Sequence, residues 1–566
     1  MSGPALAEQR EDGTQSIKSF LAPLVLEDAK IYDISYRLSK VFQNLARTGE
    51  GHFFPTPVTH LPSGKETGFY LAVDVGVTNL RVAFIELLGD DLERIGNGSS
   101  SISMAQSYIQ NNAIPKVWQR RVRRTLEKAW RIEEHLKEDP TEELFSWIGS
   151  CIADVVADEL SSHTLEFPVE LETGLSFSLP MKQKSLSEAT LMPVGKAFFI
   201  SEDLDLRQAL LDGYERHTRR TDPMEPIAKR QKVYELPRLK IVAIANDTVA
   251  TLVSLAYSVK SLPNTRVAMG IIVGAGCNAT VPMKLSDLHE SKVRQIRSYN
   301  PDATEAIINT EWTLHGTETP LKELGIFTKW DIELDAKAHR PGFQPFEYMT
   351  GARYVGELVR IVVYDYFTNV IGISAQFIPE TLTKPYALTT AFVSDVIATS
   401  RSDTILASNL AARLPPPESS PWTWTPESAG VMRATASAVQ TRSAALIAAA
   451  SVGLLACNHE IRLSEPAVAS ATSSQPDRSI VETSRDQRDA ICPCSGWHSG
   501  PEELVVAYTG GIIQHYPNFK EMCQAYIDRL IMRGGPQDEG KSVFLREASD
   551  GSIIGAGVLA GMVAGE

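Results

Sequence analysis

The sequence predicts an α/β protein with two lobes. Its 566 residues exceed what a single hydrophobic core usually serves. Between residues 69 and 245, short apolar strands alternate with helices, which is the pattern typical of α/β architecture. Apolar side chains make up 43% of the chain and charged ones 22%, so the composition is that of a globular protein with enough apolar residues for large cores.

Composition and charge also narrow the classes of function. The formal net charge of -14 argues against a general nucleic-acid binder. Six scattered cysteines are too few for a disulfide framework in so long a chain, which favours a reducing compartment. The N-terminus is polar without a secretory signal, and the longest apolar stretch, residues 444–457, is shorter than the ~20 residues of a membrane span. We therefore expect a soluble protein with a buried helix at this stretch.

Hydrophobic periodicity predicts the elements in chain order. Residues 1–16 are expected to be a flexible N-terminus, and residues 17–46 an amphipathic helix. A helix is also expected over residues 142–160, and another directly after residue 245. The predicted strands lie at residues 69–74, 82–88, 174–179 and 239–245.

Three segments interrupt this alternation. The charged stretch 116–139 has helical character, and residues 216–232 carry basic side chains at both ends. Residues 463–500 are dense in Ser, Pro, Thr and Asp, and this composition predicts a disordered surface insertion.

The turn after the first strand contains an acid, a glycine and several polar side chains. These are Asp74, Gly76, Thr78, Asn79 and Arg81. An acid at a strand tip can hold a metal directly or through water, while Gly, Thr and Asn suit a turn that approaches a phosphate. From these residues alone, an ordinary β-hairpin with a polar turn is an equal alternative.

A second acid, Asp247, stands where a buried strand ends and a helix begins. Its surroundings read Ala245-Asn246-Asp247-Thr248-Val249. Taken in isolation, Asp247 is explained by an N-cap role, because Asp at that position accepts a hydrogen bond from the first helical turn.

Taken together, the motifs resemble those of the hexokinase family. Residues 74–81 resemble the first phosphate loop, Asp-x-Gly-Gly-Thr-Asn-x-Arg, and residues 246–249 resemble the catalytic signature. The resemblance covers roughly residues 17–565 outside the insertions, and it extends to atypical hexokinase-like proteins of fungi. It implies the two-lobed, actin-like (RNase H-like) fold with an interlobe cleft.

This resemblance also implies a division of the chain. Residues 17–245 would form the N-terminal part of the family fold, with the smaller lobe over about 68–245. Residues 246–566 would form the C-terminal part and most of the larger lobe. A helix over about 555–566 would return to the smaller lobe.

A hexose site follows from the same resemblance. Asp247 would be the base that accepts the proton of the sugar 6-hydroxyl, a role worth roughly 10²–10⁴-fold in rate. The sugar-binding positions would be Ser178, Lys196, Asn246, Asp247, Asn278, Glu311 and Glu347. Carboxylates suit this task because each accepts two hydroxyl hydrogen bonds, and charge-assisted bonds are strong. The threonine that precedes the lysine in the family is Gly195 here.

The nucleotide side departs from the family in several places. The resemblance assigns ATP with Mg²⁺ to Asp74, Gly76, Thr78, Asn79, Arg81, Gly274, Gly276, Gly510 and Ser552. Val77 replaces a glycine, Ala275 a threonine and Thr509 an acid, and Ile553-Ile554 replaces a Gly-Lys pair. A β-branched residue does not easily take positive φ, and it crowds the backbone approach that glycine permits. Losing one phosphate donor can cost about 10²–10³-fold in rate.

Two functions remain open at this point. The sugar motifs match the family pattern better than the nucleotide motifs do. We therefore expect a hexose-binding regulator with weak or no kinase activity that signals to a protein partner. The alternative is an active, glycolytic-type ATP-dependent hexose 6-phosphotransferase.

Two smaller motifs bear on location and metal binding. Arg219-Arg220 and Lys229-Arg230-Gln231-Lys232 have the spacing of a bipartite nuclear import signal, with a solvated charged loop as the alternative. We expect a cytoplasmic and/or nuclear location. Cys492, Cys494 and His498 depart from zinc-site spacing and lack an obvious fourth ligand, so no protein-held metal is expected.

Overall fold

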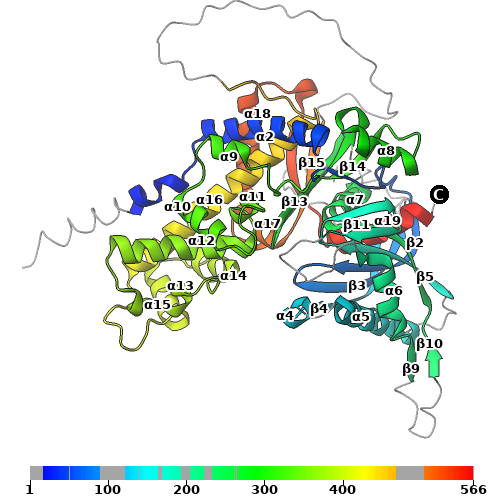
Figure 1. Cartoon of the computed structure of the whole chain (residues 1–566), viewed down its shortest axis with the longest axis horizontal. Coiled ribbons are helices and arrows are strands. Elements are labelled where there is room, and N and C mark those ends of the chain that lie inside the picture. Colours follow the sequence, from blue (N-terminus) through cyan, green and yellow to red (C-terminus); the bar gives the residue numbers. More distant parts are fainter. Residues whose placement is uncertain are drawn as a thin grey trace, which may run out of the picture.

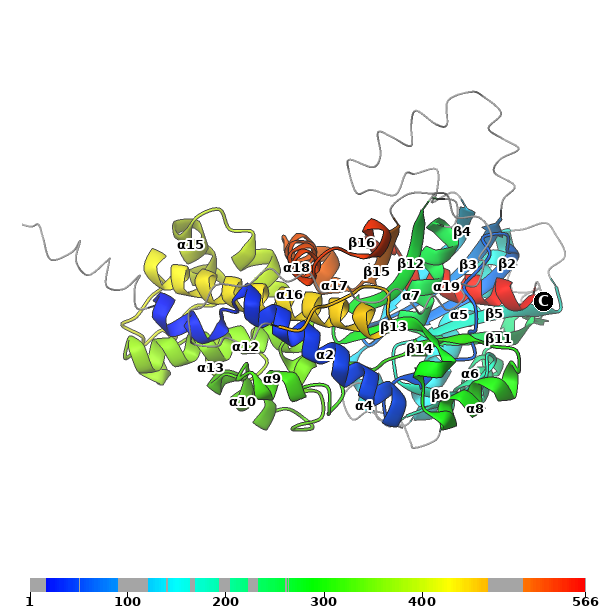
Figure 2. The same cartoon turned by 90° about the horizontal axis from the view of Figure 1, so that it is seen from above.

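The computed structural model shows two α/β lobes side by side (Figures 1 and 2). It describes residues 17–49, 51–89, 121–138, 141–162, 168–192, 204–221, 233–259, 262, 264–466 and 502–564. Each lobe has its own sheet and its own hydrophobic core, and a third cluster of apolar side chains fills the space between the two sheets.

The smaller lobe is built on a sheet in the order β11-β5-β2-β3-β4. Its strands are β2 (Thr67–Val75), β3 (Asn79–Leu88), β4 (Val122–Arg131), β5 (Glu170–Phe177) and β11 (Arg238–Asn246). Because β2, β5 and β11 are parallel, their carboxyl ends meet at one edge of the sheet. Helices α5 (Thr141–Ser162) and α6 (Leu206–Glu215) pack together and share a core with this sheet.

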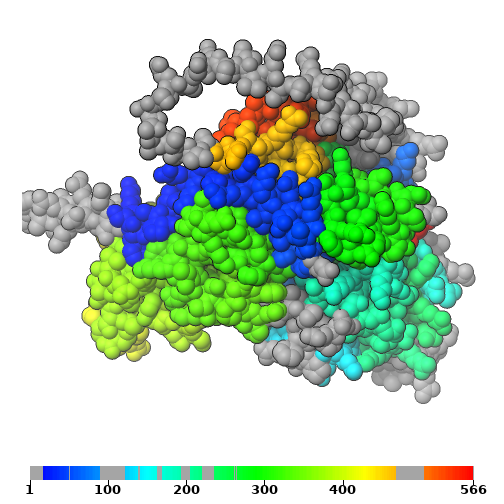
Figure 3. Space-filling view, turned by 45° about the horizontal axis from the view of Figure 1, so that its top comes forward, coloured from blue at the N-terminus to red at the C-terminus, as the bar shows by residue number. Residues whose placement is uncertain are grey.

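The larger lobe is built on a sheet in the order β1-β14-β13-β12-β15-β16. Its strands are β1 (Phe54–Pro55), β12 (Thr265–Val273), β13 (Cys277–Lys284), β14 (Glu305–Asn309), β15 (Glu503–Thr509) and β16 (Ser542–Glu547). The longest helix, α16 (Pro426–Cys457), packs on α2 (Asp28–Thr48), α12 (Ala352–Asp365), α15 (Asp403–Arg413) and α18 (Phe519–Gly534). Figure 3 shows α2 lying along the surface of this lobe.

Shorter elements complete the described ranges. In the first half of the chain they are η1 (Ala22–Leu24), α4 (Glu134–Glu138), β6 (Met181–Ser185), β7 (Glu188–Leu191), β8 (Leu204–Asp205), β9 (Arg219–Thr221), β10 (Val233–Glu235), η5 (Leu285–Asp287) and α8 (Glu290–Tyr299). In the second half they are α9 (Thr319–Glu323), α10 (Lys329–Ala336), α11 (Pro345–Tyr348), η6 (Tyr366–Val370), η7 (Ala375–Phe377), α13 (Glu380–Thr383), α14 (Thr390–Phe392), η8 (Val393–Ala398), α17 (Gly511–His515) and η9 (Asp538–Gly540).

The apolar stretch at residues 444–457 is the second half of α16. The whole helix has 32 residues, which is long enough to cross a membrane, but 89% of its most apolar window is buried inside the protein. It also carries Arg442, whose fully buried guanidinium donates to both carboxylate oxygens of Asp331 at 2.8 and 2.6 Å. Burial and this ion pair mark α16 as a core helix of the larger lobe.

Helices α7 (Asp247–Val259) and α19 (Gly551–Ala564) join the two lobes. Helix α19 packs on α7 and on strands β2, β3, β5 and β11, and α7 also packs on β12 and β13 of the other sheet. Small residues make this approach possible: a Cβ on Gly555 would lie 2.0 Å from the carbonyl oxygen of Ala250. The C-terminal helix predicted from about residue 555 begins at Gly551.

Two predicted helices differ in the structure. The charged stretch 116–139, expected to be helical, contains strand β4 and only the short helix α4 among its described residues. Pairing with the free edge of β3 overrides the local preference, because the backbone groups of the edge strand find partners there. The helix expected over 17–46 is interrupted after the turn at Ala22–Leu24, where Pro23 cannot donate a backbone hydrogen bond.

Several sequence features lie outside the described residues. They are residues 1–16, most of the predicted insertion at 463–500, the Cys492, Cys494 and His498 trio, and residues 222–232, which include the second basic cluster. A further basic run, Arg121 to Arg124, is engaged in the smaller lobe, because Arg123 pairs with Glu86, and Arg124 with Glu127 and Asp550.

Candidate functional site

The candidate site is centred on Asp247, the first residue of α7. Ser178 follows β5 and donates a hydrogen bond to the Asp247 carboxylate, while the backbone N–H of Ser178 is fixed by the carbonyl of Val75 at 3.0 Å. Asp74 lies near the end of β2 at the same sheet edge, and Glu311 approaches from the larger lobe closely enough to act on the charge of Asp247. Residues far apart in sequence therefore meet at one point.

The environment of Asp247 raises the pKa of its carboxyl to about 7. Burial is the largest cause, the negative charges of Asp74 and Glu311 act in the same direction, and the hydrogen bond from Ser178 opposes them. A carboxylate with a pKa near 7 is well matched to general-base work at neutral pH.

The same shift predicts a pH-dependent gain in stability when Asp247 is replaced by asparagine. The pKa of Asp247 rises on folding from 3.8 to about 7, so the folded state binds the proton more tightly and loses stability as the pH rises from about 4 to 7. A shift of about three units corresponds to at most about 4 kcal/mol above pH 7. We expect D247N to raise the thermal unfolding midpoint at pH 8, and to raise it much less at pH 4.5.

Asp331 is the matched control for this measurement. Burial opposes the ionisation of Asp331, but the charge of Arg442 outweighs it and lowers the pKa of that carboxyl. D331N should therefore destabilise the protein at pH 8, by about 3–5 kcal/mol for a broken buried pair. A D247N variant less stable than the unaltered protein at pH 8 would contradict the assigned environment of Asp247.

Glu311 is held in an amide-lined corner of the larger lobe. The side-chain amides of Asn278 and Asn309 donate to Glu311 Oε1 at 2.9 and 3.0 Å. Glu311 is 5% exposed and adopts φ 47°, a left-handed conformation that non-glycine residues rarely take. A carboxylate has about four lone-pair sites, so Glu311 can accept hydroxyl groups from a ligand in addition to the bonds from these two amides. Such strain accompanies functional positions more often than ordinary ones.

Glu347 lies against the loop that carries Asn278. Its Oε2 accepts a hydrogen bond from the backbone N–H of Cys277 at 3.1 Å. A Cβ on the neighbouring Gly276 would lie only 2.6 Å from that oxygen, so Gly276 is required for this contact. Glu347 is therefore connected to Asn278, and through it to Glu311.

Of the predicted sugar-binding residues, Ser178, Asn246, Asp247, Asn278, Glu311 and Glu347 are linked in this way. Asn246 is 3% exposed and directly precedes Asp247. Lys196 lies outside the described residues.

On the nucleotide side, the guanidinium group of Arg81 in the first loop is already paired with carboxylates of the protein. Arg81 donates to Asp74 at 2.9 Å and to Asp550 at 2.6 Å. Arg124 pairs with the other oxygen of Asp550 at 2.8 Å and with Glu127 at 2.7 Å. This network contains three carboxylates and two guanidinium groups, so it offers no excess positive charge to a polyphosphate.

The turn that carries the first loop is a hairpin between β2 and β3, closed by the N–H of Gly76 bonding to the Asn79 carbonyl at 2.9 Å. Thr78 and Asn79 are exposed on this turn, beside Val77. Val77 is absent from the residues with positive φ. This turn therefore takes a valine without left-handed geometry, while the bulk of the Val77 side chain remains.

The other two loops of the nucleotide side pack against each other. Gly510 adopts φ 118°, and a Cβ there would lie 2.5 Å from the carbonyl carbon of Val273, beside Gly274. The side-chain oxygen of Gln514 accepts the N–H of Gly510 at 3.0 Å. Ala275 is exposed and supplies no hydroxyl, while Ser552 lies in the first turn of α19.

Taken together, these residues fit ATP with Mg²⁺ poorly. Asp74 and Arg81 neutralise each other, and the backbone donor at Gly510 already has an internal acceptor. Where the family has an acid, Thr509 bonds weakly to Gln514 at 3.4 Å. No cluster of three or more His, Cys, Asp or Glu side chains suited to a metal occurs in the described part of the chain.

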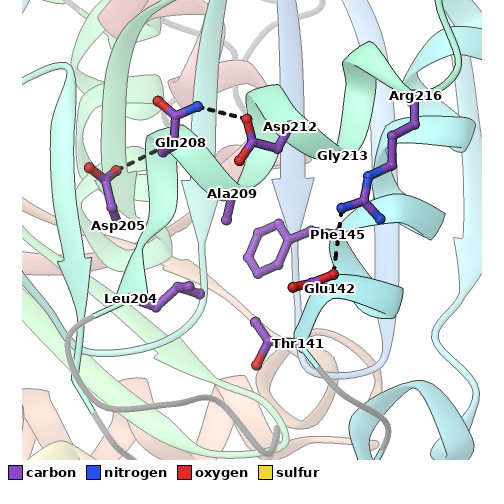
Figure 4. A pocket seen from close by; sticks show the side chains of 10 residues that line it. All are labelled: Thr141, Glu142, Phe145, Leu204, Asp205, Gln208, Ala209, Asp212, Gly213 and Arg216. Atoms are coloured by element: carbon purple, nitrogen blue, oxygen red, sulfur yellow. Dashed lines mark hydrogen bonds and ion pairs between the residues drawn. The ribbon is translucent and has the colours of Figure 1, made fainter.

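A separate cavity of about 520 Å³ lies between α5 and α6 of the smaller lobe (Figure 4). Phe145 and Ala209 contribute apolar surface, and Glu142 faces Arg216 across it at 3.6 Å. None of the predicted sugar or nucleotide residues is among the side chains that line this cavity, so it is distinct from the site around Asp247.

Sequence reasoning missed several residues that organise this site. Thr280 bonds to Thr248 at 2.6 Å beside Asn246, and no motif marked it. Gln514 was also unmarked, although it lies only five residues after Thr509. Asp550 lies two residues before the predicted nucleotide position Ser552, but the sequence did not indicate its pairing with Arg81, which is 469 positions away.

Comparisons with known proteins agree with this geometry. Two sequence profiles described as Hexokinase match residues 16–257 and 268–562. A hexokinase of Kluyveromyces lactis is 28% identical over 365 residues, covering 64% of this chain and 63% of that protein, which is less than two thirds of its own length. A putative glucokinase-2 of Saccharomyces cerevisiae is 26% identical, and the match covers 98% of this chain and 97% of that protein.

Solved structures show the same architecture. The hexokinase of Schistosoma mansoni complexed with glucose matches with a TM-score of 0.68 and 22% identity, covering 98% of this chain and 99% of that one. A second hexokinase crystal structure matches with a TM-score of 0.62 at the same identity. The predicted two-lobed, actin-like fold is thereby confirmed.

Proposed function

Since the chain belongs to the hexokinase family, we propose that it binds a hexose of the glucose class and transfers phosphoryl groups weakly or not at all. In this proposal the protein is a sugar-responsive regulator that acts through a protein partner. One contrast carries the proposal. The sugar side offers carboxylates and amides around Asp247, whereas the guanidinium of Arg81 on the phosphate side is neutralised by protein carboxylates.

The sugar side supports hexose binding by its chemistry. Asp247, Glu311 and Glu347 supply carboxylate acceptors, and the amides of Asn246 and Asn278 are held by neighbouring residues. Hydroxyl groups are recognised by such arrays because charge-assisted bonds are strong and buried acceptors are costly to leave unpaired.

The phosphate side supports a low rate. Phosphoryl transfer depends on positioning and on positive groups aimed at the transferring phosphate. Here Arg81 already contacts two carboxylates, and the positions of Ala275 and Thr509 lack the groups that the family uses. The missing groups would all act on the phosphoryl-transfer step, so the effects of their loss on the rate need not be additive.

We also propose a cytoplasmic and/or nuclear location. The proposal rests on the spacing of Arg219-Arg220 and Lys229-Arg230-Gln231-Lys232, which is that of a bipartite nuclear import signal.

An active ATP-dependent hexose 6-phosphotransferase is the second candidate. One observation favours it: Asp247 has a pKa of about 7 and lies beside Ser178, as a base for a sugar hydroxyl would require. In this case Asp247 would take the proton of the 6-hydroxyl while the surrounding acids and amides hold the ring.

One pair of measurements separates the two candidates. We expect calorimetry to detect binding of glucose, fructose or mannose, and a coupled assay with ATP and Mg²⁺ to give turnover far below the ~1–100 s⁻¹ typical of kinases. Turnover within that range would refute the regulator, and no binding at millimolar sugar would refute both candidates.

A further inference from the structure

We propose that Thr280 is a positioning residue for sugar recognition, and that it acts through Thr248 on the amide of Asn246. The inference rests on the proposed hexose site. Thr280 lies in β13 of the larger lobe, whereas Asn246 ends β11 of the smaller lobe. None of the sequence motifs assigns Thr280 a role.

The three side chains form a buried chain of hydrogen bonds. Thr248 Oγ1 lies 2.6 Å from Asn246 Oδ1 and 2.6 Å from Thr280 Oγ1. Thr248 and Thr280 are fully buried, and Asn246 is 3% exposed. Water does not compete at such sites, and bonds in a low-dielectric chain strengthen one another.

The direction of each bond follows from the number of protons. The Asn246 oxygen can only accept, so the single hydroxyl proton of Thr248 is donated to it. Thr280 must then donate its own proton to Thr248. The backbone N–H of Thr248 also donates to Asn246 Oδ1 at 3.0 Å. Two donors therefore fix which end of the Asn246 amide is oxygen.

This fixed orientation leaves the amide nitrogen available to a ligand. Among the described residues, Asn246 Nδ2 has one acceptor, the carbonyl of Leu179, at a long 3.5 Å. At least one of its two N–H groups can therefore donate to a sugar hydroxyl. A reversed amide would present oxygen instead, and the hydroxyl recognised there would have to act as donor.

Thr280 also connects the two halves of the sugar site. It lies two residues after Asn278, which donates to Glu311, and it is paired with Asn309 across β13 and β14. The chain of bonds thus fixes the distance between the Asn246 donor and the Glu311 acceptor across the junction of the lobes.

Isosteric substitution tests this role. In Thr280→Val a methyl group replaces the hydroxyl, and a carbon needs roughly 3.5 Å where the oxygens now lie closer, so Thr248 and Asn246 must shift. We expect hexose affinity to fall about five- to thirty-fold, the effect of losing one buried hydrogen bond. Thr280→Ser keeps the hydroxyl and should restore affinity.

Two further variants separate positioning from general damage. Thr435→Val removes an equally buried hydroxyl that has no partner among the described residues, in the core of the larger lobe, and should leave hexose affinity unchanged. In an Asn246→Ala background, Thr280→Val should have little additional effect on affinity, because the amide through which it acts is absent.

Calorimetry of the unaltered protein and these five variants with glucose, alongside thermal unfolding, decides the matter. Equal affinity of the unaltered protein and Thr280→Val would overturn the role of Thr280 while leaving the proposed function standing. An equal loss with and without Asn246 would also overturn it, as a general structural effect. Failure of the unaltered protein to bind any hexose would overturn the proposed function, and the positioning role with it.

Discussion

Replacing Glu311 by glutamine should weaken hexose binding by about 10²-fold while leaving the protein folded. Glutamine keeps the shape of the side chain and can still accept from Asn278 and Asn309, but it loses the negative charge. Bonds to a charged acceptor contribute about 1.5–3 kcal/mol against about 1 for neutral ones, so the loss of two hydroxyl bonds of this kind reaches about 10²-fold in affinity. Calorimetry with glucose measures it directly.

The same variant changes the titration of Asp247. The charge of Glu311 helps to raise the pKa of Asp247, so Glu311→Gln should lower that pKa and shift any pH dependence of sugar binding to more acidic values. Glu318→Gln is the matched control, because Glu318 is also buried but is bound to Gly316 and Lys322 outside the site. Equal hexose affinity in both variants would remove Glu311 from the sugar site.

Rebuilding the nucleotide side should raise turnover at least about 10²-fold. The variant combines Val77→Gly, Ala275→Thr and Thr509→Asp, which restore the family pattern at three loops. Each missing phosphate contact can cost about 10²–10³-fold, although contributions to one step do not simply multiply. The side chains at Ala275 and Thr509 reach solvent, so the larger replacements have room.

The measurement is a coupled assay of hexose phosphorylation at saturating ATP. Sugar affinity should stay the same, since none of the three positions belongs to the predicted sugar site. Adding Asp247→Asn to the rebuilt variant should abolish the gain, because the base is then absent. If the rebuilt variant turns over as slowly as the unaltered protein, the residues at positions 77, 275 and 509 do not limit the rate of phosphorylation.

The fold class and most of the smaller sheet could be predicted from the sequence. Strands such as β2 and β5 are apolar runs that end in turns with polar residues, and both features can be recognised from the local sequence. Strand β4 escaped because its charged sequence is explained only by the neighbouring β3 and by partners such as Glu86 and Asp550. An edge strand is stabilised by pairing with the neighbouring strand, and the hydrophobic periodicity of its own sequence does not reveal that pairing.

The residues of the candidate site also fall into those that the local sequence marks and those that only the folded chain brings together. Asp247 and Glu311 lie in contiguous motifs, so the sequence marks them. Thr280 and Gln514 act through contacts with residues 32 and 4 positions away, respectively, and a lone threonine or glutamine carries no signal of its own. The internal pairing of Arg81 with Asp550 spans 469 positions, and only the folded chain reveals that this cation is already neutralised.

The close contact of Gly276 with Glu347 changes how glycine-rich loops of this kind should be interpreted. Any side chain at position 276 would displace a carboxylate on the sugar side, and a side chain at Gly510 would collide with the strand beneath it. Hexose recognition would preserve Gly276, and the packing of the strand would preserve Gly510, whether or not the protein binds a nucleotide. These two glycines are therefore weak evidence for ATP binding, and positions 275 and 509 are more informative about it.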